Sequence, residues 1–330
     1  MAAFRPGPPV SISVVIPTYN RLPYLRAAVA SAREQTRPPE EILIVDDGST
    51  DGTEQFARSL PAPVRYLRQA NAGPAAARNQ GFRAATGDWI ALLDSDDWWP
   101  ADKLARQEAF LRLHPHLAFV FGTQLNSRAG QTDAQPEILD PEVHATLRRE
   151  AAGIRDFFSL LLRLNPVPTS SVLFRRDCLA RTGGFDEARW RCEDYELWFR
   201  FAAAFPIGYL DHPLVFKRSQ DDNLINDYAK LWAAHLDVLL SLPRTHPGRN
   251  LPANPAWRQA TAYTRYRLGS FHLRRGAVPA ALEHFGAFHE RDLPASARLH
   301  ALSRVKRALL AAGLGRLARR TPPASTPLPR

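Results

Sequence analysis

The sequence predicts an α/β fold built on a mostly parallel, doubly wound sheet with helices on both faces, followed by a C-terminal helical extension. Short apolar runs alternate with segments of helical spacing through the first hundred residues. Each run ends in a polar cluster, and sheets of this kind bind ligands beyond the carboxyl ends of their strands. Past about residue 225, helical periodicity alone remains.

Four mostly apolar runs predict the strands, at 12–16, 42–45, 64–67 and 89–93. Between the first two, residues 21–35 carry apolar side chains at the spacing of an amphipathic helix. Strand, loop and helix repeated in this way favour a parallel sheet. Because the polar clusters directly follow the strands, one sheet would bring them all to one crevice.

The fourth run ends in three carboxylates within four residues, Asp94, Asp96 and Asp97. Like charges this close repel one another, and each resists burial unless something compensates it. A divalent cation that carries a diphosphate would compensate them with few protein ligands. A solvated acidic turn is the alternative for an isolated Asp-x-Asp, and the other polar clusters favour the cation site.

Six segments, taken in order, resemble the motifs of the family 2 glycosyltransferases of the GT-A fold. They are 15–21 (VIPTYNR), 45–53 (VDDGSTDGT), 71–81 (NAGPAAARNQG), 93–97 (LDSDD), 183–187 (GGFDE) and 193–198 (EDYELW). Each motif alone is a weak signal, whereas six in the expected order are specific, and the resemblance covers about residues 10–225. It implies an inverting hexosyltransferase that uses a nucleotide diphosphate sugar with Mn²⁺ or Mg²⁺.

The resemblance implies a donor site around the ends of the first strands. The loop that would wrap the nucleotide consists of Pro17, Thr18, Tyr19 and Asn20. Asp46 ends the second strand and is expected to accept a hydrogen bond from uracil N3–H, since a carboxylate only accepts, so a UDP-sugar is expected. Asp47 and Ser49 are expected to shape the next turn. Arg78 follows small residues that permit close approach and is expected to contact the nucleotide or its phosphates.

The residues of the acidic turn, 94–97, are expected to have different roles. Asp94 would contact the ribose or the metal shell, Ser95 would line the donor site, and Asp96 would coordinate the cation directly. Ligands that are all oxygens suit Mn²⁺ or Mg²⁺ better than Zn²⁺. Asp97 is expected to cap a helix that begins near Pro100.

Inverting transfer needs a general base that takes the proton of the acceptor hydroxyl. By resemblance this base is Asp194, with Glu193 beside it as the fallback. Both lie at the start of a predicted helix, where the helix dipole favours carboxylates, so charge placement for the helix alone is the alternative. Asp186 and Trp190 are expected to lie on the acceptor side.

The chain departs from the family in one segment. Many relatives carry Arg-x-His-x-x-Asn after the last core strand, and here Gln220 stands at the His position. Glutamine is a poor metal ligand, so Lys217 and Arg218 are the remaining candidates to hold the diphosphate. His212 lies nearby and is expected to be a turn residue that precedes the strand.

Three regions are predicted along the chain. The catalytic domain spans 1–225, with a nucleotide-binding half at 10–125 and an acceptor half at 126–225. A helical extension covers 226–320, with helical periodicity at 227–242, 257–275 and 278–290. The Pro-rich tail 321–330 is expected to be disordered.

The length and composition of the chain are those of a globular protein. A chain of 330 residues with 45% hydrophobic residues can hold one large domain and an appendage, and its two cysteines show no metal-binding spacing. Residues 1–9 lack an apolar signal region, and no stretch reaches the roughly 18 apolar residues of a membrane span, so a cytoplasmic protein is expected.

The charge balance favours acidic partners, since 43 Lys and Arg face 33 Asp and Glu. Residues 298–320 form a basic amphipathic pattern without acidic residues. Such a helix either lies on an anionic membrane surface, at the inner face of the cytoplasmic membrane, or docks on the core. The other expected partners are a nucleotide-sugar and a polysaccharide or lipid-linked acceptor of the cell envelope, with no nucleic acid.

Two other classes of function stay open at this point. A binding or scaffold protein could keep the fold without turnover, although intact Asp96 and Asp194 argue against it. A nucleotidyltransferase also uses paired aspartates with a metal, but residues 14–21 lack the Gly-rich basic signature that class would need.

Overall fold

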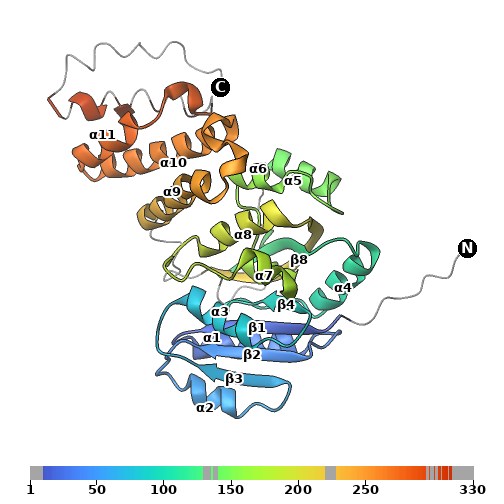
Figure 1. The fold of residues 1–330 in the computed structure, drawn as a ribbon. Coiled ribbons are helices and arrows are strands. Elements are labelled where there is room, and N and C mark those ends of the chain that lie inside the picture. The colour runs from blue at the N-terminus through green and yellow to red at the C-terminus, as the bar shows by residue number, and fades with distance from the viewer. Residues whose placement is uncertain are drawn as a thin grey trace, which may run out of the picture. The chain divides into compact units, whose positions relative to one another are not determined.

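The computed structural model describes residues 10–128, 135–136, 140–219 and 228–294, together with scattered positions between 297 and 313. The chain folds into two compact units, 1–223 and 224–330. The first unit holds the sheet and the second consists of helices (Figure 1). The predicted fold class, an α/β sheet with helices on both faces and a helical C-terminal region, is confirmed.

Eight strands in the described part of the chain form one sheet, in the order β3-β2-β1-β4-β7-β5-β6 with β8 paired to β5. The strands are β1 Ile12–Thr18, β2 Glu41–Asp46, β3 Val64–Arg68, β4 Trp89–Leu92, β5 Phe119–Arg128, β6 Gln135–Pro136, β7 Leu173–Arg175 and β8 Ile207–Ser219. β3, β2, β1 and β4 pair in parallel, as do β5 and β8, whereas β7 and β6 run antiparallel to their neighbours.

The first unit also contains helices that connect and cover these strands. They are α1 Leu22–Arg33, α2 Thr53–Arg58, α3 Pro74–Ala84, α4 Lys103–Leu113, α5 Pro141–Arg149, α6 Phe157–Arg163, α7 Leu179–Thr182 and α8 Glu193–Ala204. Two short 3₁₀ turns matter for position: η1 Thr169–Ser171 precedes β7, and η2 Arg176–Cys178 follows it.

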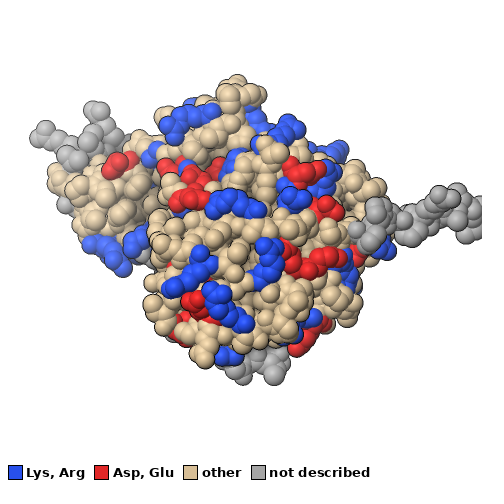
Figure 2. Space-filling model, turned by 60° about the horizontal axis from the view of Figure 1, so that its bottom comes forward, with Lys and Arg blue, Asp and Glu red and all other residues tan. Residues whose placement is uncertain are grey.

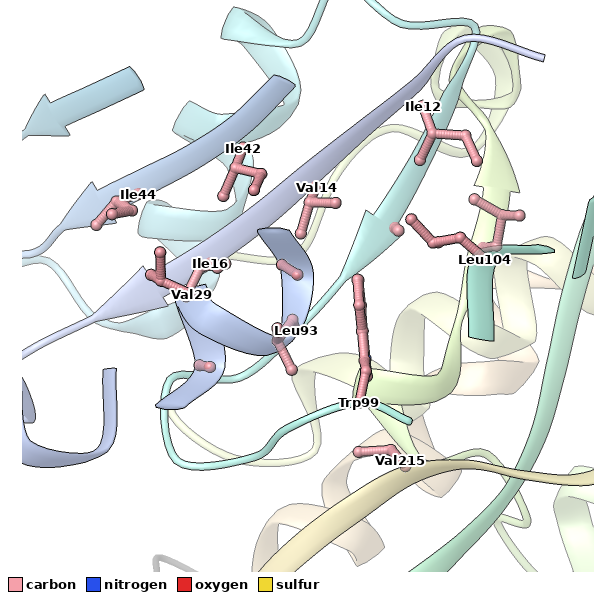
Figure 3. Packing of buried hydrophobic residues seen from close by; sticks show 14 of the residues in the cluster. Ile12, Val14, Ile16, Val29, Ile42, Ile44, Leu93, Trp99, Leu104 and Val215 are labelled. Carbon is pink, nitrogen blue, oxygen red and sulfur yellow. The ribbon is translucent and has the colours of Figure 1, made fainter. Parts of the chain in front are cut away.

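Alternate side chains of the central strand β1 pack against opposite helical layers. Val14 and Ile16 lie in one core cluster with Val29 of α1 (Figure 3). Val15 faces the other way, and a Cβ added at Gly81 of α3 would clash with it, so glycine lets α3 approach the sheet closely. Because side chains alternate across a strand, α1 and α3 must cover opposite faces.

This arrangement creates a topological switch point between β1 and β4. The chain runs outward from β1 through β2 to β3, and then returns through α3 to place β4 on the other side of β1. Doubly wound sheets bind ligands at such a switch point, beyond the carboxyl ends of the strands.

The strands form because their sequences suit burial on both faces. All seven residues of β1 and all six of β2 are buried, which is typical of parallel strands covered by helices. Beyond β4, aromatic rings form the packing between the sheet and α8, where Trp198 contacts Phe119 and Phe201 edge-on or tilted. This aromatic packing holds α8 against the sheet. The N-terminus of α8 carries Glu193 and Asp194, here called the Glu-Asp pair.

The second unit is built from α9 Tyr228–Thr245, α10 Pro255–Arg274 and α11 Val278–Gly286, close to the three predicted helical segments. α10 packs against both α9 and α11, and Gly269 of α10 leaves room for the ring of Phe285 on α11. No helix among the described residues is both long and apolar enough to cross a membrane. Most of the predicted basic helix 298–320 lies outside the described residues.

The excess positive charge is not gathered into one patch on the face shown in Figure 2. Basic and acidic side chains are interspersed there. Interspersed charges cancel at distances beyond about 8–10 Å at moderate salt. Electrostatic interactions on this face therefore act through local pairs of charges.

Candidate active site

The loops after β1 and β2 are tied into one structure. The backbone N–H of Asn20 donates to Ser49 Oγ at 2.9 Å, and the Thr50 N–H donates to Asn20 Oδ1 at 2.8 Å. The Leu22 N–H at the start of α1 donates to Asp51 Oδ2 at 2.9 Å, so the second loop caps the first helix. Asn20 has a φ of 50°, a left-handed conformation that asparagine tolerates well. The first loop is therefore held in a fixed shape.

The predicted nucleotide loop begins inside the sheet. Pro17 and Thr18 are the last residues of β1, whereas Tyr19 beyond them is 49% exposed. Thr18 is buried, and its Oγ1 has no hydrogen-bond partner within the described residues. A buried hydroxyl without a partner at the switch point is a feature that a ligand could satisfy.

Asp46 is fully buried at the end of β2, and both of its carboxylate oxygens accept hydrogen bonds. The donors are the Ser49 N–H at 2.7 Å and the Tyr66 hydroxyl at 2.7 Å. Burial and the Asp46 carboxylate together raise the pKa of Tyr66. Asp46 thus holds the second loop to β3, and contact with a uracil ring stays a prediction.

Asp47 ties the second loop to the start of α3. Its carboxylate accepts from the N–H groups of Ala72 at 2.9 Å and Gly73 at 2.8 Å. Gly73 has a φ of 92° and lies under the ring of Trp190, which would be 3.6 Å from a Cβ at that position. The positive φ favours glycine at this position, whereas a Cβ would make only ordinary van der Waals contact with the indole.

Arg78 of α3 links the acidic turn that follows β4 to the Glu193–Asp194 pair at the start of α8. Its guanidinium donates to Asp94 Oδ1 at 2.7 Å and to Glu193 Oε1 at 2.8 Å, and it also lies over the ring of Phe185. Only 7% of the Arg78 side chain is exposed. Burial opposes its charge, but the two carboxylates outweigh burial and hold the pKa of Arg78 above its usual value. Its Nε–H is buried and has no partner within the described residues.

The acidic turn lies directly after β4. Burial raises the pKa of Asp96, and the charge of Asp94 raises it further. Asp97 is more deeply buried, and burial together with Asp94 and Asp96 raises its pKa to about 8. Ser95, between Asp94 and Asp96, is also buried. Ionisation of Asp96 and Asp97 is disfavoured in this setting, so a bound cation would be stabilised here.

The prediction that Asp97 caps a helix near Pro100 is wrong. α4 begins at Lys103, its N-cap residue is Asp102, and Asp97 points elsewhere. Its Oδ2 accepts from Ser170 Oγ at 2.7 Å and its Oδ1 from the Arg218 N–H at 3.3 Å. Tertiary partners from η1 and β8 compete successfully for this carboxylate because the turn folds back onto both.

Arg218 of β8 is stacked between two aromatic rings. Its guanidinium carbon lies 5.1 Å from the ring centre of Tyr24 and 4.8 Å from that of Trp98. Its Nε–H donates to the carbonyl oxygen of Asp96 at 3.3 Å. This arrangement clamps the acidic turn between α1 and β8, and contact of Arg218 with a diphosphate stays a prediction.

Three further residues lie near Arg218 in the sequence. Lys217 precedes it in β8, and its charge favours ionisation of Asp96. His212 was expected before the strand, which is wrong, since it lies inside β8 next to an irregularity in the pairing with β5. Gln220 lies outside the described residues.

The Glu-Asp pair begins α8. Glu193 is buried and paired with Arg78, and burial raises its pKa although Arg78 opposes that shift. Asp194 is more accessible, and its Oδ2 accepts from Thr169 Oγ1 at 2.8 Å. The preceding residue, Cys192, has a φ of 57°, which turns the chain sharply into the helix.

The loop 183–192 supplies the remaining predicted acceptor residues. Asp186 pairs with Arg189 at 3.1 Å, and Trp190 is 59% exposed. Asn79 holds this loop, since its side-chain amide accepts from the Phe185 N–H at 2.8 Å and donates to the Phe185 carbonyl at 2.9 Å. The loop is thereby fixed to α3, one residue after Arg78.

The carboxylate oxygens of the acidic turn are suitable ligands for a hard divalent cation. Arg78 takes one oxygen of Asp94, so its other oxygen and the carboxylate of Asp96 would hold the ion. No group of three or more His, Cys, Asp or Glu side chains in the described part of the chain is arranged as a complete metal site. Two carboxylates with a diphosphate are enough for Mg²⁺ or Mn²⁺, which bind oxygen ligands and commonly take phosphates.

Sequence reasoning did not single out Asn79, Thr169 or Ser170. Asn79 directly follows Arg78 in a segment that did resemble the family, so its place was available as a signal. Thr169 and Ser170 lie in the segment PTSS between α6 and β7, where hydroxyl residues alone predict only a turn. Their partners are 25 and 73 residues away, which no local pattern reveals.

A family model described as Glycosyl transferase family 2 matches residues 13–178, half of the chain. The chain belongs to glycosyltransferase family 2. It is 28% identical over 238 residues to an uncharacterized glycosyltransferase of Rickettsia typhi, covering 69% of this chain and 72% of that relative. It is 38% identical over 140 residues to the putative teichuronic acid biosynthesis glycosyltransferase TuaG of Bacillus subtilis, covering 41% and 52%.

Solved structures share the fold of this glycosyltransferase. TarS of S. aureus in complex with UDP-GlcNAc superposes with a TM-score of 0.62 at 18% identity, covering 94% of this chain and 92% of that one. The mannosyltransferase PcManGT of Pyrobaculum calidifontis, in complex with GDP-Man and Mn²⁺, superposes with a TM-score of 0.56 at 21% identity, covering 96% and 90%. The predicted GT-A fold and family are confirmed.

Proposed function

We propose that this glycosyltransferase is an inverting, metal-dependent hexosyltransferase that moves a sugar from a UDP-sugar to a hydroxyl of a cell-envelope glycan or lipid-linked acceptor. One observation carries the proposal: Arg78 joins the acidic turn to the Glu-Asp pair, with bonds of 2.7 and 2.8 Å, beside the switch point of the sheet. The carboxylates that we assign to the donor side and to the acceptor side are thereby held by one guanidinium.

Asp94 and Asp96 would hold Mn²⁺ or Mg²⁺ together with the diphosphate of the donor. When bound, such an ion acts as a Lewis acid that stabilises the charge on a departing nucleoside diphosphate. Support comes from the pKa of Asp96, which burial raises and the charge of Asp94 raises further, so that a nearby cation would stabilise the ionised carboxylate. The Mn²⁺ in the complex of the fold relative PcManGT supports the same assignment.

Asp194 would act as the general base. Glu193 is buried and engaged by Arg78, whereas Asp194 is accessible and bound through a single hydroxyl and the backbone. A carboxylate in this position can accept the proton of an acceptor hydroxyl as its oxygen attacks the anomeric carbon. Asp186 and Trp190, on the loop beside it, would orient the acceptor.

The proposed donor and acceptor have different support. The TarS complexes contain UDP and UDP-GlcNAc, and the buried Asp46 ends β2 beside the switch point. The PcManGT complex contains GDP-Man, so GDP is the competing donor nucleotide. The envelope-glycan acceptor is supported by the likeness to TuaG, whose name places it in teichuronic acid biosynthesis.

Calorimetry with UDP, GDP, CDP and dTDP, each with Mn²⁺ and with a chelator, tests the donor assignment. The wild type is compared with Asp96→Ala and with Asp102→Ala. Asp102 is a partly exposed aspartate before α4 that forms no side-chain cap and pairs only with Arg106 within the described residues. We expect metal-dependent UDP binding that Asp96→Ala abolishes and Asp102→Ala retains.

The other outcomes separate the alternatives. Tight binding of another nucleotide would overturn the UDP assignment and keep the enzyme. Binding of no nucleotide at all would favour a scaffold protein that keeps the fold without turnover. Release of free pyrophosphate from nucleoside triphosphate and sugar phosphate would indicate a nucleotidyltransferase instead.

A further inference from the structure

The 3₁₀ turn Thr169–Ser171 contacts both acidic motifs through neighbouring residues. Thr169 Oγ1 donates to Asp194 Oδ2 at 2.8 Å. Ser170 Oγ donates to Asp97 Oδ2 at 2.7 Å and accepts from the Asp94 N–H at 3.0 Å. A single peptide bond therefore separates the residue that holds the proposed base from the residue that holds the acidic turn.

The turn itself is rigidly held. Its backbone carbonyls accept side-chain donors from the loop after β4 and from α4, namely Trp99 Nε1 at 2.7 Å and Gln107 Nε2 at 2.9 Å. Ser171 Oγ donates to the Pro168 carbonyl at 2.8 Å. Ser170 and Ser171 are buried, whereas Thr169 at the edge of the turn is partly accessible. Such packing lets the turn transmit a fixed geometry to its partners.

We propose that this turn is the positioning element that sets the general base relative to the acidic turn, with Thr169 orienting Asp194 and Ser170 orienting the backbone of Asp94 and the carboxylate of Asp97. The inference rests on the proposed function. It assigns Thr169 no direct contact with the donor, so its effect is on the chemical step alone.

The physical reason lies in the torsion of the carboxylate. Rotation about the last bond of an aspartate is only weakly restricted, so hydrogen bonds decide where its lone pairs point. In Asp194, Oδ1 accepts from the Tyr195 N–H and Oδ2 from Thr169, which fixes the carboxylate plane. Displacing a reacting group by about 1 Å can cost about 100-fold in rate.

The test uses Thr169→Val, which keeps the shape of the side chain and removes its donor, and Thr169→Ser, which restores the donor. We expect kcat to fall by about 10- to 100-fold in Thr169→Val, the range for a lost hydrogen bond to a charged group. The donor KM and the calorimetric affinity for UDP with Mn²⁺ should stay within about twofold, and Thr169→Ser should recover most of kcat.

Two further variants complete the experiment. Thr146→Val removes a hydroxyl whose partners within the described residues, Glu142 and Arg149, both lie in α5, so it should leave kcat unchanged. Ser170→Ala should instead weaken metal-dependent UDP binding by about tenfold or more, because the acidic turn loses its partner. One substitution is thus expected to lower kcat and its neighbour to weaken UDP binding. A general loosening of the fold would not separate the two effects in this way.

The contrary outcomes are distinguishable. If Asp194→Asn is inactive but Thr169→Val keeps kcat within twofold, the positioning role is wrong and the proposed function stands. If Thr169→Val loses kcat and UDP affinity together and Thr169→Ser does not recover it, the turn has only a structural role. If Asp194→Asn transfers sugar as fast as the wild type, the proposed base is wrong and the inference about Thr169 fails with it.

Discussion

Removal of Arg78 should destabilise the first unit far more than removal of an exposed arginine. The guanidinium is buried and holds two carboxylates, with 11% of the Glu193 side chain and 30% of the Asp94 side chain exposed. In Arg78→Met, Glu193 is left as a buried carboxyl without its cation. Breaking a buried pair in this way costs about 3–5 kcal/mol.

We place the expected cost at the lower end of that range, about 3 kcal/mol, because solvent screens the partly exposed Asp94. Glu193→Gln alone keeps an oxygen that can accept from Arg78, so it should cost only about 1 kcal/mol. The double variant has neither charge of the buried pair, and should cost about 2 kcal/mol rather than the sum of about 4. The difference is a coupling free energy of about 2 kcal/mol.

The assay is denaturant unfolding followed by tryptophan fluorescence, since Trp198 is fully buried in the first unit. Arg83→Met on the same helix is the control, because Arg83 is 66% exposed and its pair with Glu187 is 3.8 Å long. It should change the free energy of unfolding by no more than about 0.5 kcal/mol. Additivity of the Arg78 and Glu193 substitutions within about 0.5 kcal/mol would refute the bridge as a source of stability.

Two other predictions concern titratable groups whose pKa is lowered by burial. Lys103 is fully buried 3.9 Å from the ring centre of Trp99, its Nζ has no hydrogen-bond partner within the described residues, and burial lowers its pKa. Lys103→Met should therefore raise the free energy of unfolding at pH 7 by about 1–3 kcal/mol, whereas exposed Lys230→Met should not, and a loss of stability would contradict this account. Burial lowers the pKa of His235 in α9 to about 4, so the unfolded chain binds its proton first as the pH falls. Stability should be lost from about pH 6.5 down to pH 4, by about 3 kcal/mol in total, and His235→Asn should remove that part of the slope in a pH series of unfolding curves.

The order of elements was readable from the sequence because it depends on local patterns. Apolar runs marked β1 to β4, and polar residues marked the point where each strand ends. Motif order then indicated the family. These signals are strong because a strand covered on both faces requires nearly continuous apolar residues, as in β2.

The partners of each polar side chain were not readable in the same way. Asp97 was predicted to cap a helix, because aspartate is a preferred residue at helix N-termini. In the folded chain it instead binds Ser170 and Arg218, which lie 73 and 121 residues away. A buried carboxylate bonds the groups that pack around it in the folded chain. A rule based on neighbouring residues cannot identify partners that lie in distant segments.

The sequence by itself determined the fold class, the family and the identity of the residues that gather at the carboxyl ends of the strands. Only the tertiary structure decided that Arg78 joins Asp94 to Glu193, and that Thr169 and Ser170 join the proposed base to the acidic turn. The physical reason is the range of the interactions. Secondary structure follows from periodicity over a few residues, whereas hydrogen bonds and ion pairs act over about 3 Å between groups that only the packing of the sheet and helices brings together.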